Sequence, residues 1–175
     1  MNISRIVWVL LCVAFLFSCK KKDPSALAEE NVSTLNKYSA YISDVSSGMI
    51  SVSDKVYVIL QNPIQGWDDN QELSKDLFTV SPRVKGKVIA VNNKTISFQP
   101  DESFDEDTVY TFTLNLEELI EDLEEDLDDE FVFTVRTLKQ QFSVITDNLQ
   151  SYSKDWQYLD GTINTSDQLS FDIAK

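Results

Sequence analysis

Apolar side chains at every second position of residues 109–116 constrain the fold more than any other part of the chain. The apolar positions of this segment are Tyr110, Phe112, Leu114 and Leu116. Since successive side chains of a β-strand point to opposite faces, the pattern predicts a strand with one buried and one solvated face. Residues 131–137 repeat the pattern, with Phe131, Phe133 and Val135 aligned. The two segments therefore predict partner strands that supply an aromatic core.

Further short runs of β-branched and aromatic residues precede this pair, and turn signals separate them. The runs are 54–61, 78–80, 84–91 and 95–99, and the turn signals are Asn62-Pro63, Ser81-Pro82, Asn92-Asn93 and Pro100. About seven short strands over roughly a hundred residues, with helices scarce, are typical of a β-sandwich. We therefore expect an all-β, immunoglobulin-like sandwich over residues 38–138.

The composition excludes several classes of function. The chain has 175 residues, two cysteines and no histidine, and its net charge is −14. Without histidine the chain lacks the commonest general base, the commonest zinc ligand and every Ser-His or Cys-His catalytic pair. Nucleic-acid binding needs a basic surface, which the acidic balance does not supply. We therefore expect no enzyme activity, no cofactor, no metal and no nucleic-acid partner.

The first eighteen residues have the features of an export signal. Arg5 precedes an unbroken apolar run, 6–17, which is too short to cross a bilayer core and has the length of a signal-peptide core. Leu16-Phe17-Ser18-Cys19 follows, and then Lys20-Lys21-Lys22. The segment resembles a bacterial lipoprotein signal with residues 16–19 in the lipobox, although Phe17 is bulkier than the usual residue there.

That resemblance implies that residues 1–18 are removed and that Cys19 is the lipid attachment site, through palmitate or a similar acyl chain. The expected partner is then the lipid bilayer, and the expected location is the bacterial cell envelope, on the outer membrane, facing the periplasm or the cell surface. An ordinary signal peptide cut elsewhere, or an uncleaved anchor, is the alternative. Residues 19–37 are mostly polar and predict a flexible tether.

A strongly acidic segment, 116–131, separates the two clearest strands. Its apolar residues are Leu116, Leu119, Ile120, Leu123 and Leu127. Their spacing predicts a short amphipathic helix that lays its leucines over the edge of the core and its carboxylates in solvent. Clustered carboxylates also suit calcium, but an EF-hand loop needs a glycine that this segment lacks, so the solvated helix face is favoured. Asp68-Asp69 is a second carboxylate pair, but nothing fixes its separation as catalysis would require.

A second, shorter β-type series follows residue 138. Its runs are 141–146, 156–164 and 169–173. Some thirty-five residues cannot bury a core of their own, so residues 139–175 are expected to be the incomplete start of a second β domain. The chain is accordingly expected to be the head of a longer, multidomain protein.

Several of these segments together resemble a bacterial Ig-like domain. More narrowly, they look like the domain that opens bacterial α2-macroglobulin-like lipoproteins. The matching segments are 78–86, 94–100, 109–114 and 131–135, with 136–142 in place of the link to the next domain and 160–167 resembling the first strand and turn of that domain. The resemblance covers roughly residues 38–167 and implies that 139–175 begin a macroglobulin-like β domain.

The resemblance also implies a function. Members of that family resemble host endopeptidase inhibitors that trap a protease, some of them through a Cys-Gly-Glu-Gln thioester motif that this sequence does not contain. The leading hypothesis is therefore a membrane-tethered scaffold fragment of a protease trap, which meets proteases only through domains beyond residue 175. The alternative is an Ig-like adhesion, glycan-uptake or envelope-assembly module of a surface lipoprotein.

Overall fold

The computed structural model describes residues 24–120, 122–151, 153 and 157–168. The expected signal peptide and Cys19 lie outside these residues. Within the described part of the chain, no helix is long and apolar enough to cross a bilayer.

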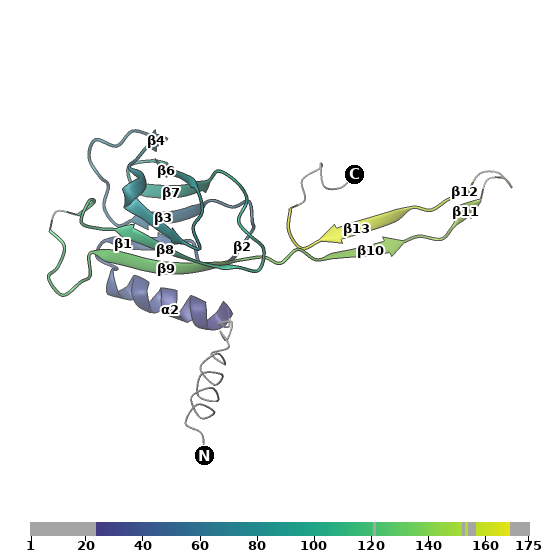
Figure 1. The fold of residues 1–175 in the computed structure, drawn as a ribbon, viewed down its shortest axis with the longest axis horizontal. Coiled ribbons are helices and arrows are strands. Elements are labelled where there is room, and N and C mark those ends of the chain that lie inside the picture. Colours follow the sequence, from purple (N-terminus) through teal and green to yellow (C-terminus); the bar gives the residue numbers. More distant parts are fainter. Residues whose placement is uncertain (1–23, 121, 152, 154–156, 169–175) are drawn as a thin grey trace, which may run out of the picture.

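Two β-sheets pack face to face and confirm the expected sandwich (Figure 1). The five-stranded sheet has the order β1 (Ile42–Val45), β3 (Val56–Leu60), β7 (Thr95–Pro100), β6 (Gly86–Ala90) and β4 (Gln71–Glu72). The four-stranded sheet has the order β2 (Gly48–Ile50), β9 (Glu130–Thr137), β8 (Val109–Asn115) and β5 (Phe78–Ser81). The 3-10 helix η1 (Lys75–Leu77) precedes β5. All strand pairs are antiparallel except β2–β9, which is parallel.

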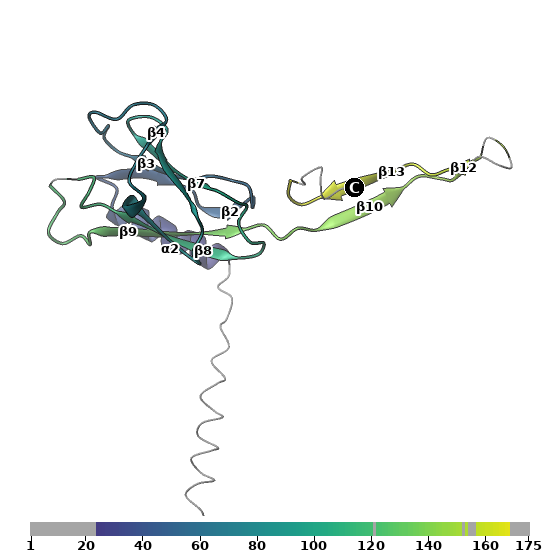
Figure 2. The ribbon, with the colours of Figure 1, turned by 45° about the horizontal axis from the view of Figure 1, so that its top comes forward.

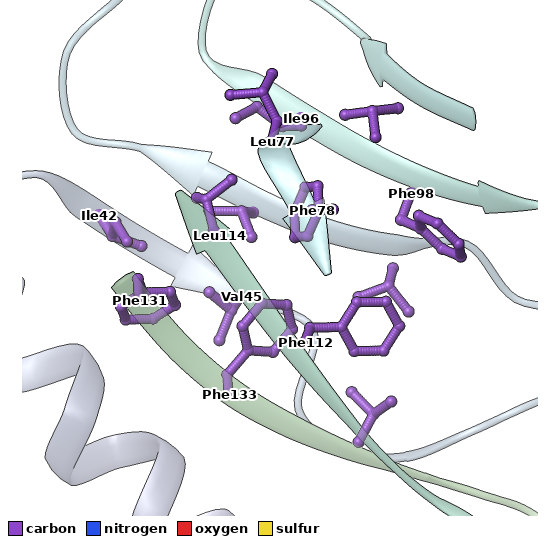
Figure 3. Packing of buried hydrophobic residues seen from close by; sticks show 14 of the residues in the cluster. Ile42, Val45, Leu77, Phe78, Ile96, Phe98, Phe112, Leu114, Phe131 and Phe133 are labelled. Carbon is purple, nitrogen blue, oxygen red and sulfur yellow. The ribbon is translucent and has the colours of Figure 1, made fainter. Parts of the chain in front are cut away.

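The core lies between the inner faces of the two sheets (Figure 3). The inward positions expected on β8 and β9 are buried: Tyr110, Phe112, Leu114, Phe131, Phe133 and Val135. Phe112 stacks on Phe133 with ring centroids 5.4 Å apart and meets Phe98 of the opposite sheet edge-on at 5.6 Å. Aromatic contacts therefore join the two sheets without a disulfide.

The acidic segment between β8 and β9 differs from its prediction. Its described residues form turns in place of the expected amphipathic helix. The backbone N–H of Leu116 donates to the carbonyl oxygen of Asp129 at 2.8 Å, so strand pairing holds both ends of the segment together. Carboxylates four residues apart, such as Glu118 and Asp122, also repel one another in a helix.

The leucines of that segment nevertheless contact the core as expected. Leu116 is buried, and Leu119, Ile120, Leu123 and Leu127 are partly buried against the core, while the carboxylates that the structure describes are exposed. The spacing of the leucines therefore predicted correctly which side chains contact the edge of the core. Turns place these side chains on the core as well as a helix would.

The expected tether also needs correction, because residues 24–37 form a helix. Helix α2 (Pro24–Lys37) begins with a proline, which suits the first turn of a helix, and residues 26–30 (Ala-Leu-Ala-Glu-Glu) are good helix formers. Leu27 and Asn31 are buried on the face that contacts the four-stranded sheet, and Leu35 is partly buried. The helix is part of the folded domain, packed against β9 (Figures 1 and 2).

Helix α2 covers an open edge of β9. Strand β2 pairs with β9 only over Val135–Thr137, so the preceding half of β9 has a strand neighbour on the β8 side alone. There the Asn31 side chain takes the place of a strand: its Nδ2 donates to the carbonyl oxygen of Thr134 at 2.6 Å, and its Oδ1 accepts from the Thr134 N–H at 2.9 Å. Covering an edge in this way prevents pairing with other chains.

Replacing Asn31 with alanine should lower the free energy of unfolding by about 1–3 kcal/mol, because both backbone groups of Thr134 lose their partner in a half-buried setting. Urea unfolding followed by tryptophan fluorescence measures the effect. Ser33→Ala is the matched control, since Ser33 lies exposed on the same helix. Equal unfolding midpoints for the two variants would contradict the role of Asn31.

Beyond β9 the chain forms a long two-stranded hairpin that extends away from the sandwich (Figures 1 and 2). Its inner part pairs β10 (Phe142–Thr146) with β13 (Gly161–Thr165), and its outer part pairs β11 (Gln150–Ser151) with β12 (Gln157–Tyr158). The run predicted at 141–146 is thus a strand, whereas 156–164 contains β12 and most of β13. The run at 169–173 lies outside the described residues.

Candidate interaction surface

A network of hydrogen bonds fixes the end of β9 where the chain leaves the sandwich. The buried Thr137 hydroxyl donates to the carbonyl oxygen of Asp105 at 2.6 Å and accepts from the Thr108 N–H at 2.9 Å. The Asp105 N–H in turn donates to the Tyr110 hydroxyl at 2.9 Å, and burial raises the pKa of that hydroxyl. The turn before β8 and the end of β9 are therefore held as one unit.

An ion pair reinforces the same unit. Arg136 Nε donates to Asp107 Oδ1 at 3.1 Å, and Arg136 Nη2 contacts the same oxygen. Asp107 has a φ of 48°, a left-handed conformation that aspartate tolerates better than most residues. The two side chains are only 14% and 28% exposed, which reduces the solvent screening of the pair.

Three contacts then attach the hairpin to the sandwich. Before β10, the Leu138 N–H donates to the carbonyl oxygen of Ile50 at 2.9 Å, and the Gln140 N–H donates to Glu106 Oε2 at 3.1 Å. After β13, the Val52 N–H donates to Asp167 Oδ2 at 3.0 Å. Because both ends of the hairpin are attached, its base is fixed to the sandwich.

The Asp167 contact depends on an ionised carboxylate. Partial burial raises the pKa of Asp167, but hydrogen bonds from the Ser51 side chain and from the backbone of Val52 and Gln168 outweigh it, so the pKa is lowered from 3.8. A lowered pKa stabilises the folded state above the unfolded-state pKa and loses that contribution as the pH falls through the folded-state value. The attachment is therefore fully present at neutral pH.

One face of the hairpin is apolar and exposed to solvent. Val144 of β10 lies opposite Ile163 of β13, and Phe142 lies beside them on the same face opposite Thr165. The exposed fractions of Phe142, Val144 and Ile163 are 74%, 56% and 64%. The opposite face carries Ser143, Ile145, Thr162 and Asn164. An apolar face next to a polar one is the pattern of a sheet that packs against another layer.

The carboxylates considered as catalytic or calcium-binding residues are not brought together. Asp68 and Asp69 lie exposed in the loop before β4, while Trp67 packs against the core. Within the described residues, no three acidic or cysteine side chains are grouped so as to hold a metal ion. Cys19, the expected lipid site, lies outside those residues.

The residues that attach the hairpin were missed by the sequence analysis. Segment 136–142 was expected to be a link between domains, but Asp167 and Val52 are 115 positions apart and no local pattern joins them. The buried Thr137, between Arg136 and Leu138, likewise gave no signal.

Comparison with known proteins gives one family match. Residues 36–137 match the family model described as a bacterial Ig-like domain. No curated protein matches this chain.

Eight chains of solved structures match, among them L,D-transpeptidase 3 from Mycobacterium tuberculosis in complex with a faropenem-derived adduct. The sequence identity is 13% and the TM-score is 0.37. The match covers 58% of this chain and 39% of the transpeptidase chain.

Proposed function

The chain belongs to the family of bacterial Ig-like domains, and from this premise we propose that it is a non-enzymatic scaffold module that positions further β structure near a membrane. The observation that carries the proposal is the hairpin, whose base is fixed to the sandwich by Leu138, Gln140 and Asp167. A fixed base with a bare apolar face suits a second β layer that packs on it in a defined orientation.

We propose that Cys19 carries the membrane anchor. The support is the sequence alone: the apolar run before Cys19 and the three lysines after it, which would lie against anionic headgroups. Helix α2 begins at Pro24, so at most roughly 18 Å of extended chain separates the lipid from the folded domain. The sandwich is thus held closer to the membrane surface than the flexible tether expected over residues 19–37 would place it.

Replacing Cys19 with serine should move the protein from the membrane fraction to the soluble fraction, because the acyl chains supply the stable anchoring. Fractionation of cells that express the native chain or the variant measures the change. Ser18→Ala is the control, because it alters the neighbouring residue and keeps the thiol. Membrane residence of Cys19→Ser equal to that of the native chain would refute lipid anchoring at this position.

We further propose that the module belongs to an α2-macroglobulin-like endopeptidase inhibitor. The order of the matching segments from 78 to 135, followed by the link and the hairpin, supports this assignment. In such a protein the described residues are the membrane-proximal scaffold, and domains beyond the hairpin trap the protease.

The inhibitor assignment predicts that the product of the complete gene protects a large protein substrate from a general protease, while small peptide substrates are still cleaved. The measurement compares both substrates at increasing inhibitor-to-protease ratios. Undiminished cleavage of the large substrate at excess protein would reject the trap and favour the alternative, an Ig-like module for adhesion, glycan uptake or envelope assembly.

A further inference from the structure

The local charge is reversed in one part of this acidic chain. Residues 77–100 contain no aspartate or glutamate but include Arg83, Lys85, Lys87 and Lys94. The chain as a whole has a net charge of −14. The segment spans β5, β6 and β7, and Arg83 and Lys85 lie on the side of the sandwich where the chain passes from β5 to β6.

A groove lies on that side, between the edge strand β5 and strand β6 of the facing sheet. We call it the β5 groove; its volume is about 480 Å³. Apolar residues that include Phe78, Val88 and Phe98 line it, together with the exposed cations Lys75, Arg83 and Lys85. Asp76 and Asp101 are its acidic members.

The three cations of the β5 groove have no ionic partner in the described part of the chain. The ion pairs found there are Lys37–Asp128, Lys87–Glu72 and Arg136–Asp107. With Asp76 and Asp101 the charged lining residues sum to +1 (three cations less two carboxylates), in a chain whose net charge is −14, so the groove is the more favourable place for a carboxylate.

Strand β5 also offers an open edge. Among the described residues it is the last strand of its sheet, with β8 as its only strand neighbour. At its start the Phe78 N–H donates to the carbonyl oxygen of Lys75 in η1, and at its end the chain turns away at Pro82. Between these points Phe78, Thr79 and Val80 line the groove, so an extended chain bound there would lie alongside β5.

We propose that the β5 groove binds an extended acidic segment of a partner protein, which adds a strand to β5 and places carboxylates against Lys75, Arg83 and Lys85. Strand addition supplies backbone hydrogen bonds, and the cations select acidic side chains. A concave site beside a strand edge fits an extended chain, whereas a flat bilayer surface fits neither the groove nor the edge.

A labelled peptide tests the proposal. The probe is a fluorescein-tagged octapeptide of alternating glutamate and valine, with a lysine-valine peptide as its charge-reversed control, added to the purified full chain in detergent. Fluorescence anisotropy should show salt-sensitive binding of the acidic peptide alone. Arg83→Glu/Lys85→Glu should weaken this binding at least tenfold. The matched control, Lys55→Glu/Lys139→Glu, changes the charge equally at exposed residues outside the groove and should leave binding within twofold.

Hydrogen exchange of the native chain locates the peptide without any variant. Protection confined to 78–81 and the adjoining loop supports the proposal. Equal weakening by both double variants, or protection on β10 and β13, overturns it. Binding to anionic phosphatidylglycerol vesicles without binding to the acidic peptide also overturns it, in favour of a membrane contact.

Discussion

Phe112→Ala should lower the free energy of unfolding by about 3–5 kcal/mol, the loss typical of truncating a fully buried phenylalanine. Phe112 is fully buried in the central part of the four-stranded sheet. Its ring meets Phe78 and Phe133 of its own sheet and Phe98 of the facing sheet, with centroids 5.4–6.3 Å apart. Alanine would therefore leave a cavity at the point where the two sheets join.

Urea unfolding of the native chain and the variant measures the loss. Val132→Ala is the control, because Val132 lies on the neighbouring strand with its side chain on the outer face, 39% exposed; it should cost well under 1 kcal/mol. Phe112→Leu keeps much of the volume and should give an intermediate value. Similar midpoints for Phe112→Ala and Val132→Ala would show that the aromatic cluster does not stabilise the sandwich.

The same burial explains why the central strands could be predicted. Alternation along 109–116 and 131–137 is a local record of which side chains face the core, and the structure buries those side chains. Strand β2 left no such record, because it has three residues and pairs with β9, whose residues lie 87 positions further along the chain (Gly48 pairs with Val135). Local sequence patterns indicate which side chains are buried. The pairing of strands that are distant in the sequence depends on tertiary contacts, which such patterns do not show.

The corrected elements follow from the same distinction. Helix α2 buries Asn31, a polar residue that bonds to a strand edge, so its inner face does not show as an apolar stripe. The leucines of the acidic segment do show as a stripe, yet turns place them on the core as well as a helix would. In the acidic segment the sequence indicated burial but not the backbone conformation, and in helix α2 it indicated neither.

The sequence predicted strands after residue 138 but not the surface that they form. The residues of 141–146 indicated a strand. The attachment of its hairpin depends on the contact between Asp167 and Val52, which no local pattern could predict because the two residues are 115 positions apart. The reversed charge of 77–100 is visible in the sequence, although its gathering into a groove depends on the approach of β5 to β6.

Gly86→Ala provides a second large effect, in which two opposing contributions must be weighed. Alanine in the middle of a strand is favoured over glycine by roughly 0.5–1 kcal/mol, because glycine loses more backbone freedom on folding, and at Gly86, the first residue of β6, this gain is at most that large. Against this, a Cβ atom at residue 86 would lie 2.5 Å from the carbonyl oxygen of Gln99 and 2.6 Å from the Phe98 ring. The first contact is with the backbone of the paired strand β7, which cannot move away without disturbing the β6–β7 pairing.

We therefore expect the steric term to exceed the backbone term and Gly86→Ala to destabilise the sandwich by about 1–3 kcal/mol. Thermal unfolding measures this, and Gly161→Ala in the exposed hairpin is the control. There the nearest atom is at 3.0 Å and the neighbouring side chains lie outside the core, so the sandwich should melt as in the native chain.

The double variant Gly86→Ala/Phe98→Leu separates the two contacts at residue 86. If the Phe98 ring were the main obstacle, Gly86→Ala would cause little destabilisation in the Phe98→Leu background. If the clash is with the Gln99 carbonyl oxygen, most of the destabilisation should remain. A Gly86→Ala variant as stable as the native chain would mean that β6 can shift away from β7, and the close approach of the two strands would then not constrain this position.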